Sequence, residues 1–319
     1  MKTDRILLVA FSVLLLSTLV LCQQPATPVT PETLPASAAN EPAELVKQGR
    51  KLSDEGKHDE ALALFKQAME AKPDFADAHL ATGVTLDLKG DYTQAREHIA
   101  KAIELAPPDQ KSRALRTMGM AYAFVCQPRE SEKYHKQVFD GQVAEQKYTD
   151  AAGTANELAR VLLECNDIAG AERWYKTGYD TARKETNLSE KDRALWDFRW
   201  HHALARLAAR RGKKPDAKKH VTEARAALDK AQDKNQEPYF PYLTGYVAFY
   251  SKNYKSAVTD LEKANQNDPF ILALLAQAYE KLGDQAKAQE LYRRVLTFNN
   301  HNPTNAYARP LAKKKLGGS

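Results

Sequence analysis

Small, large and turn-forming residues recur in the same order along this chain from residue 42 onward. Small side chains mark places where two helices cross closely, because a larger one would push the axes beyond the usual ~8–10 Å. Large residues such as Leu52 and Phe65 fill the space between the crossings, and Gly56 ends the first helix of the unit. Four positions return 34 residues later, where Gly49, Ala61, Ala68 and Pro73 become Gly83, Ala95, Ala102 and Pro107. The pattern predicts stacked helix-turn-helix units.

Looser units with the same small, large and turn positions extend the array over residues 42–302, to about seven units. Extra residues in the middle of the array favour a bend or a break near 185–197. In the last unit, we expect the first helix to start with Asp268 as N-cap and Pro269 at the first helical position. Residues 303–319 then supply a C-terminal capping helix and tail.

The period and its residues resemble the tetratricopeptide-repeat (TPR) family over roughly residues 42–300. The resemblance implies an all-α, right-handed α-solenoid of stacked helix-turn-helix TPR units. It also implies binding rather than catalysis, with partners held on the concave surface. Composition agrees with the helical fold, since the chain is 28% charged and 43% hydrophobic with only 14 glycines.

The first 22 residues have the three regions of a signal peptide. Lys2 and Arg5 precede an apolar run over residues 6–21, which at ~1.5 Å per residue is shorter than the ~30 Å core of a bilayer. The run ends in Leu-Val-Leu-Cys, which resembles the lipobox of bacterial lipoproteins and would make Cys22 a lipidated N-terminus. Ordinary cleavage, after Cys22 or near residue 38, is the alternative.

Residues 23–41 are rich in proline and small polar residues and cannot build a core. We expect a disordered tether, which at ~3.1 Å per residue could reach ~60 Å. A tether that directly follows Cys22 would be useful if Cys22 were anchored in a membrane. The expected location is therefore the periplasm or the outer membrane through a lipid on Cys22, and alternatively the protein is secreted.

In the TPR family the groove is lined by the first helix of each unit, and two neighbouring units place a basic and aromatic set there. The set is Arg199, His202, Arg206, Arg210, Tyr239, Tyr242, Tyr246, Phe249 and Tyr250. Arginine binds carboxylates through two parallel hydrogen bonds and tyrosine supplies rigid contact area, so the set predicts a groove for an extended, partly acidic peptide. The alternative is that some of these tyrosines only pack between helices, as Tyr246 and Tyr250 would one turn apart.

Asn156 and Arg160 hold two groove positions of the preceding unit. Their order reverses the carboxylate clamp by which chaperone-binding members of the family hold their partners. A chaperone co-factor role is therefore disfavoured.

A basic turn follows the arginine-rich helix, formed by Arg210, Arg211, Lys213, Lys214, Lys218 and Lys219. Such clusters are usually solvated surface. In an exported protein the functional interpretation is binding to anionic lipid or a cell-wall polymer. The net charge of +6 is too mild for a nucleic-acid signature.

Motifs for metal or cofactor chemistry are missing from the sequence. His201 and His202 are adjacent on a predicted helix, where neighbours point ~100° apart and cannot both face one ion. No paired cysteine and histidine spacing, phosphate loop or nucleophile motif occurs. We therefore predict no metal, no cofactor and no catalytic residue.

Cys126 and Cys165 fall in the turns of successive units. Equivalent turns of stacked units should lie ~10 Å apart, beyond the ~5.5–6 Å Cα separation of a disulfide. The expectation is two free thiols, although an exported chain makes a bond worth testing.

Together these patterns favour a non-catalytic protein–protein interaction scaffold of the bacterial cell envelope. Protein or peptide partners would occupy the concave TPR groove, with no nucleic acid and no small-molecule substrate. The first alternative is an anionic lipid or cell-wall polymer binder that uses the basic turn over residues 210–219. The second is an enzyme with a site assembled from scattered helices.

Overall fold

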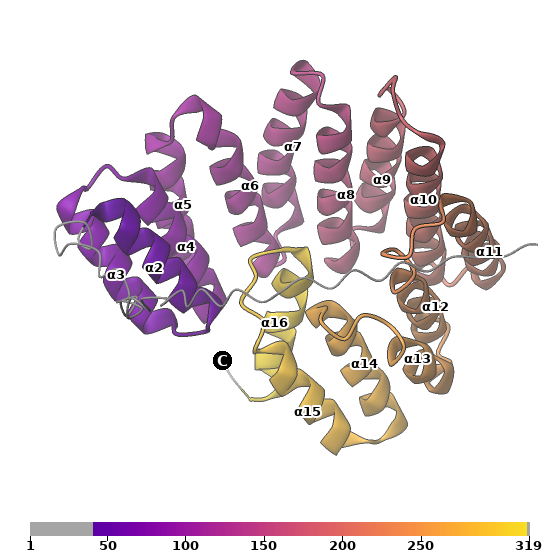
Figure 1. The fold of residues 1–319 in the computed structure, drawn as a ribbon. Helices are drawn as coiled ribbons and strands as arrows, with labels where there is room; N and C mark the ends of the chain where they lie inside the picture. Colours follow the sequence, from indigo (N-terminus) through magenta and orange to yellow (C-terminus); the bar gives the residue numbers. More distant parts are fainter. Residues whose placement is uncertain (1–40, 318–319) are drawn as a thin grey trace, which may run out of the picture. The chain divides into compact units, whose positions relative to one another are not determined.

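The structure, a computed structural model, describes residues 41–317 and contains fifteen helices and no strand within them (Figure 1). The first eight are α2 (Pro42–Asp54), α3 (His58–Ala71), α4 (Ala76–Lys89), α5 (Tyr92–Leu105), α6 (Pro108–Phe124), α7 (Pro128–Ala144), α8 (Tyr148–Glu164) and α9 (Ile168–Ala182). The other seven are α10 (Glu190–Arg210), α11 (Lys214–Ala231), α12 (Tyr239–Tyr250), α13 (Tyr254–Leu261), α14 (Pro269–Leu282), α15 (Gln285–Val295) and α16 (Pro303–Lys315). The predicted all-α solenoid of stacked helix pairs is confirmed.

The predicted leader, Cys22 and nearly all of the tether predicted over residues 23–41 lie outside the described residues. Within residues 41–317, none of the helices has both the length and the apolar character that crossing a membrane requires.

Consecutive helices pair along the chain, and each pair stacks on the next (Figure 1). The pairs are α2/α3, α4/α5, α6/α7, α8/α9, α10/α11, α12/α13 and α14/α15. Local capping agrees with the sequence: Gly90 ends α4 in the left-handed conformation with a φ of 104°. Asp268 is the N-cap of α14, as predicted, and its Oδ1 accepts a hydrogen bond from the Phe270 N–H at 2.8 Å.

Small residues lie at the close crossings within the pairs, as predicted. A Cβ atom on Gly83 would lie 2.5 Å from Cγ1 of Ile99 and 2.8 Å from the carbonyl oxygen of Ala95, so α4 and α5 approach too closely for a side chain. Ala95 and Ala102 are fully buried. Glycines at the same repeat position face a large side chain of the second helix in three other pairs, as Gly49 with Phe65, Gly119 with His135 and Gly245 with Leu261.

The helix stack continues through the region where a bend or a break was expected. Helices α9 and α10 pack against each other on either side of residues 183–189, and the rings of Tyr179 and Trp200 stack with centroids 5.3 Å apart. Further along, α12 contacts α10 more extensively than it contacts its neighbour in sequence, α11. This places the first residues of α12 beside α10.

Helix α16 does more than cover the last pair, because it also contacts α6 and α8 of the first half (Figure 1). Arg309 of α16 is buried, and its Nε donates to the carbonyl oxygen of Leu88 at 2.6 Å. Lys313 Nζ donates to the carbonyl oxygen of Lys89. Both carbonyls lie in the last turn of α4, where no helical N–H is left to pair with them and where positive charge is favourable. The end of the chain therefore caps a helix near its beginning.

The expectation of free thiols is wrong, because Cys126 and Cys165 form a disulfide. Their Cα atoms are 5.5 Å apart, not the ~10 Å expected from the spacing of helix axes. The spacing between helix axes does not apply to residues beyond a helix end, because the chain there turns away from the axis of its helix. Cys126 lies past the C-cap of α6 in the left-handed conformation, with a φ of 51°, whereas Cys165 is itself the C-cap of α8.

Candidate functional site

An open cavity of about 500 Å³ lies where α8, α10 and the start of α12 meet. Helix α8 contributes Asn156, Glu157 and Arg160, and α10 contributes Trp196, Phe198, Arg199, His202 and Arg206; Tyr175 of α9 and Tyr239 of α12 complete most of the wall. The lining is therefore mainly basic and aromatic.

Arg206 lies at the bottom of this wall with only 5% of its surface exposed. Its Nη2 donates to the Tyr175 hydroxyl at 2.8 Å, and its guanidinium lies 5.4 Å from the centroid of the same ring. Among the described residues, Arg206 forms no ion pair with a carboxylate. Its charge is compensated mainly by aromatic faces and one hydroxyl, which are weaker partners than a carboxylate.

Arg160 and Arg199 share this lack of a carboxylate partner within residues 41–317. The Arg160 guanidinium lies 4.8 Å from the ring centroid of Phe270, and its buried Nε and Nη2 have no hydrogen-bond partner among the described residues. The exposed Arg199 lies over Trp196, 4.6 Å from the ring centroid. Because buried cations are costly without a partner, the cavity favours an anionic guest.

Glu157 is the carboxylate in the lining, and its charge is already engaged. Arg116 of α6 donates to it from Nε at 2.9 Å and 3.1 Å and from Nη2. Burial raises the pKa of Glu157, but the nearby His135, whose Nε2 lies 3.6 Å from Oε1, and the hydrogen bonds from Arg116 outweigh burial and leave this pKa lowered. Glu157 is thus held as an anion without neutralising the three arginines of the cavity.

His202 contributes no positive charge to the cavity. Burial, followed by the charges of Arg206 and Arg160, lowers the pKa of His202 well below its usual value. The ring is therefore neutral near neutral pH, and its Nε2 has no hydrogen-bond partner in the part of the chain that the structure describes.

A buried polar layer lies beside the cavity and belongs to the packing of the helices. Glu164 of α8 pairs with Arg210 of α10 at 3.2 Å, and Arg210 also donates to the Tyr246 hydroxyl at 3.2 Å. Burial raises the pKa of Glu164, although Arg210, Arg206 and Arg160 oppose this shift. Tyr246 is fully buried, and burial raises its pKa well above the usual value. None of these three groups is presented on an open surface.

The structure places the residues that were predicted to line one groove in two different environments. Four line the cavity: Arg199, His202, Arg206 and Tyr239. The other five take part in the packing around α10, α12 and α14: Arg210, Tyr242, Tyr246, Phe249 and Tyr250. The sequence left open whether some tyrosines serve only in packing, and the positions of Tyr242 and Tyr246, which are 3% and 0% exposed, agree with that alternative.

Two segments of the chain, residues 46–110 and 271–302, match family models described as tetratricopeptide repeat. Tetratricopeptide repeats are therefore present in these two segments. Among solved structures, a tetratricopeptide repeat protein from Parabacteroides merdae is 12% identical with a TM-score of 0.52, covering 86% of this chain and 98% of its own. A putative kinesin light chain with TPR-like repeats from Podosopora anserina is 17% identical with a TM-score of 0.49, covering 60% and 97%. No curated protein matches the sequence. The first likeness supports the TPR fold and no more than the fold.

Several residues that line this cavity were missed by the reasoning from sequence. Asn156 and Arg160 hold the same repeat positions as the predicted groove residues, so the rule that found Arg206 could have found them. They were considered only as members of a chaperone clamp. Trp196 and Tyr175 gave no signal, because their contribution depends on how α9 and α10 pack.

The basic residues of the turn over residues 210–219 also fall into two groups, one ion-paired and one exposed. Arg210 pairs with Glu164, and Arg211 pairs with Glu172 at 2.6 Å. The four lysines remain exposed: Lys213, Lys214, Lys218 and Lys219. The alternative of binding to an anionic surface therefore depends on these four lysines.

Proposed function

We propose that this chain is a non-catalytic scaffold that binds a carboxylate-bearing segment of a partner protein in the cavity between α8, α10 and α12. Proteins built from tetratricopeptide repeats are generally protein-interaction scaffolds. The observation that supports the proposal is the group of three guanidiniums, of Arg160, Arg199 and Arg206, around a cavity of about 500 Å³ with no ion pair among the described residues.

The aromatic residues in the wall favour a peptide over a bare anion. Tyr239 is 38% exposed and offers flat apolar surface beside the arginines, whereas Trp196 and Tyr175 are each 4% exposed and support the guanidiniums of Arg199 and Arg206. An aspartate or glutamate side chain, or a C-terminal carboxylate, would satisfy the guanidiniums while its neighbours pack on the rings. The volume lies within the range of small binding pockets, ~300–1,000 Å³, and is sufficient for a short segment rather than for a folded domain.

Fluorescence anisotropy with two matched peptide pools tests this proposal. One pool carries Asp and Glu at random positions, and the other carries Asn and Gln at the same positions. We expect the full chain to bind the acidic pool only, and Arg199→Gln to weaken binding about tenfold. Arg199 is exposed, so this variant should fold normally.

Arg173→Gln is the matched control, because Arg173 is exposed on α9 and is not part of the cavity lining. Equal affinity for both pools, or equal weakening by the two substitutions, would contradict the proposal.

We further propose that the scaffold acts outside the cytoplasm, in the periplasm or at the outer membrane. The support is the signal-like sequence before residue 22 together with the Cys126–Cys165 disulfide, since such bonds persist in oxidising compartments. Intact mass of the protein from cells distinguishes the routes. A lipid-sized increment on Cys22 indicates anchoring, and an unmodified terminus at Gln23 or later indicates ordinary cleavage.

A further inference from the structure

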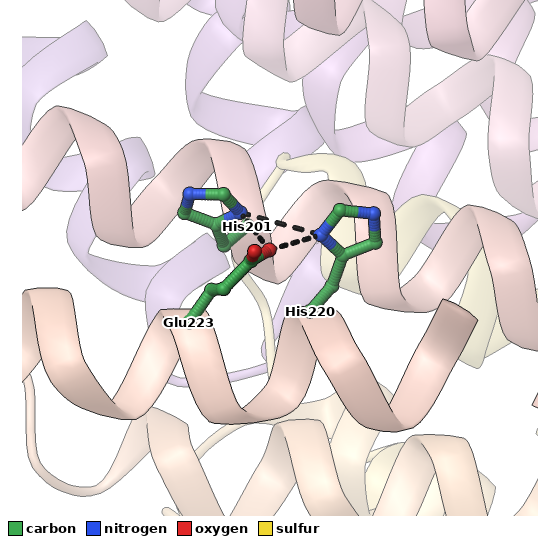
Figure 2. A group of neighbouring side chains, drawn as sticks. All are labelled: His201, His220 and Glu223. Atoms are coloured by element: carbon green, nitrogen blue, oxygen red, sulfur yellow. Dashed lines mark hydrogen bonds and ion pairs between the residues drawn. The ribbon is translucent and has the colours of Figure 1, made fainter. Parts of the chain in front are cut away.

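A histidine of α10 meets a histidine and a glutamate of α11 on the packed face of this helix pair (Figure 2). Nδ1 of His201 lies 3.3 Å from Nδ1 of His220 and 3.0 Å from Oε2 of Glu223. The same Oε2 lies 2.7 Å from Nδ1 of His220. Figure 2 shows the three side chains converging from the two helices.

We propose that His201, His220 and Glu223 form a binding site for a divalent transition-metal ion, with zinc as the best match. Two imidazole nitrogens and one carboxylate oxygen are a usual ligand set for zinc, with metal–ligand distances of ~2.0–2.2 Å. Tetrahedral coordination at those distances separates the donors by about 3.3 Å. The three observed separations equal this value or fall below it by up to about 0.6 Å, so small side-chain rotations would admit the ion.

The surroundings of the cluster are compatible with an ion. The three side chains keep 26%, 21% and 35% of their surface exposed, so an ion can enter from solvent and retain water as a fourth ligand. The second oxygen of Glu223 faces Lys219 at 3.9 Å, which leaves Oε2 for the histidines. Asp197, whose charge also acts on His201, accepts a hydrogen bond from the Tyr179 hydroxyl at 2.7 Å.

A second histidine pair in the molecule supplies an internal comparison. His79 of α4 and His98 of α5 are 19 residues apart, as are His201 and His220, and their Nδ1 atoms lie 3.2 Å apart. Lys101 stands where the other pair has Glu223, and it pairs with Glu104. At the position equivalent to Glu223 the α4/α5 pair therefore offers a lysine in place of a carboxylate, and we expect it to bind metal poorly.

A bound ion would connect α10 to α11, and α10 also carries Arg199, His202 and Arg206 of the cavity. The ion would stabilise the helix that presents these residues. This inference does not depend on the proposed function, because the ion site and the cavity use different side chains.

Titration of zinc into the full chain, prepared without a histidine tag and stripped with EDTA, tests the site. We expect one equivalent of zinc to bind and to raise the Tm by about 5 °C at a hundredfold excess over Kd. His201→Ala and Glu223→Gln should each weaken binding at least about tenfold, and His79→Ala should leave the affinity unchanged. Circular dichroism of the variants establishes that they remain folded.

Cobalt provides an independent readout, because a tetrahedral cobalt site with nitrogen and oxygen ligands has visible absorption that His201→Ala should abolish. Failure of zinc to bind, or the same affinity in His201→Ala as in the unmodified chain, would show that the cluster is an ion-free hydrogen-bonded group. A loss of binding in His79→Ala would place the site at the other histidine pair and would equally overturn the proposal.

Discussion

The crossing of α4 with α5 and the contact of α16 with α4 are both buried, but they are built from opposite kinds of side chain. At the crossing, Gly83 and Ala95 bring two helices together around Ile99, and all three residues are apolar. At the contact with α16, Arg309 donates hydrogen bonds to the carbonyls of Leu88, Leu296 and Phe298. The nearby Asp87 is fully buried and lies 2.8 Å from Nε2 of His301.

This difference separates two sources of stability in one molecule. Close crossings of this kind recur in several pairs and gain free energy by burying apolar surface at close range. The contact of α16 joins residues 221 positions apart and depends on satisfying carbonyls at the end of a helix. Loss of a side chain should therefore be most costly where buried polar groups would be left unpaired.

Arg309→Leu should have the largest effect, a loss of about 4 kcal/mol in the free energy of unfolding, because several buried carbonyls lose their donor at once. Urea unfolding followed by circular dichroism measures this loss. Lys314→Leu, an exposed position on the same helix, should change stability little. Comparable losses in the two variants would mean that helix propensity, and not the polar contact, determines how α16 docks.

Gly83→Ala should cost less, about 2 kcal/mol, because one added methyl group must displace Ile99 or the backbone of α5. Gly141→Ala is the matched control, since its Cβ would meet no atom within 4 Å on α7. That control should gain about 0.5–1 kcal/mol from helix propensity. Thermal and urea unfolding check both signs, and a gain in both variants would show that the crossing is looser than described.

Asp87→Asn should have the smallest effect, and the effect should depend on pH. Burial raises the pKa of Asp87, although His301 opposes the shift, so the folded chain holds this proton more tightly than the unfolded chain. The stability that this group contributes is present below the ordinary pKa of aspartate and is lost as pH rises through the raised value. Asparagine does not titrate and can still accept a hydrogen bond from His301.

Between about pH 4 and about pH 7, the stability of Asp87→Asn relative to the unmodified chain should therefore rise. Urea titrations of both proteins at the two pH values give this difference. A constant difference would indicate that the pKa of Asp87 is the same in the folded and unfolded chains.

The repeating part of the fold could be predicted because its partners are close in sequence. Gly83 and Ala95 mark a crossing within one helix pair, and Asp268 with Pro269 marks a helix start through local chemistry. The contacts of Arg309 could not be predicted, since no period relates α16 to α4. The distance between Cys126 and Cys165 was misjudged because it depends on how the chain leaves two helix ends.

The candidate site was predictable only in part for the same reason. Repeat positions identified Arg206 and could have identified Arg160, but they do not reveal whether a side chain is exposed. Tyr246 holds a groove position and is nevertheless buried, because α12 packs beside α10 and against α14. His201 could not be linked to Glu223 from adjacent histidines alone, since the partner lies on another helix.

The hydrogen bonds of residues 299–313 to the ends of α2 and α4 give this array a fixed number of repeats. Stacked-repeat proteins commonly change length by gaining or losing whole units, since each unit contacts only its neighbours. Here the insertion or deletion of a helix pair between α5 and α14 would move Arg309 away from Leu88. The guanidinium and the carbonyl oxygen would then both lose their hydrogen-bond partner. Variation in relatives should therefore appear within loops and helix lengths rather than in the count of pairs.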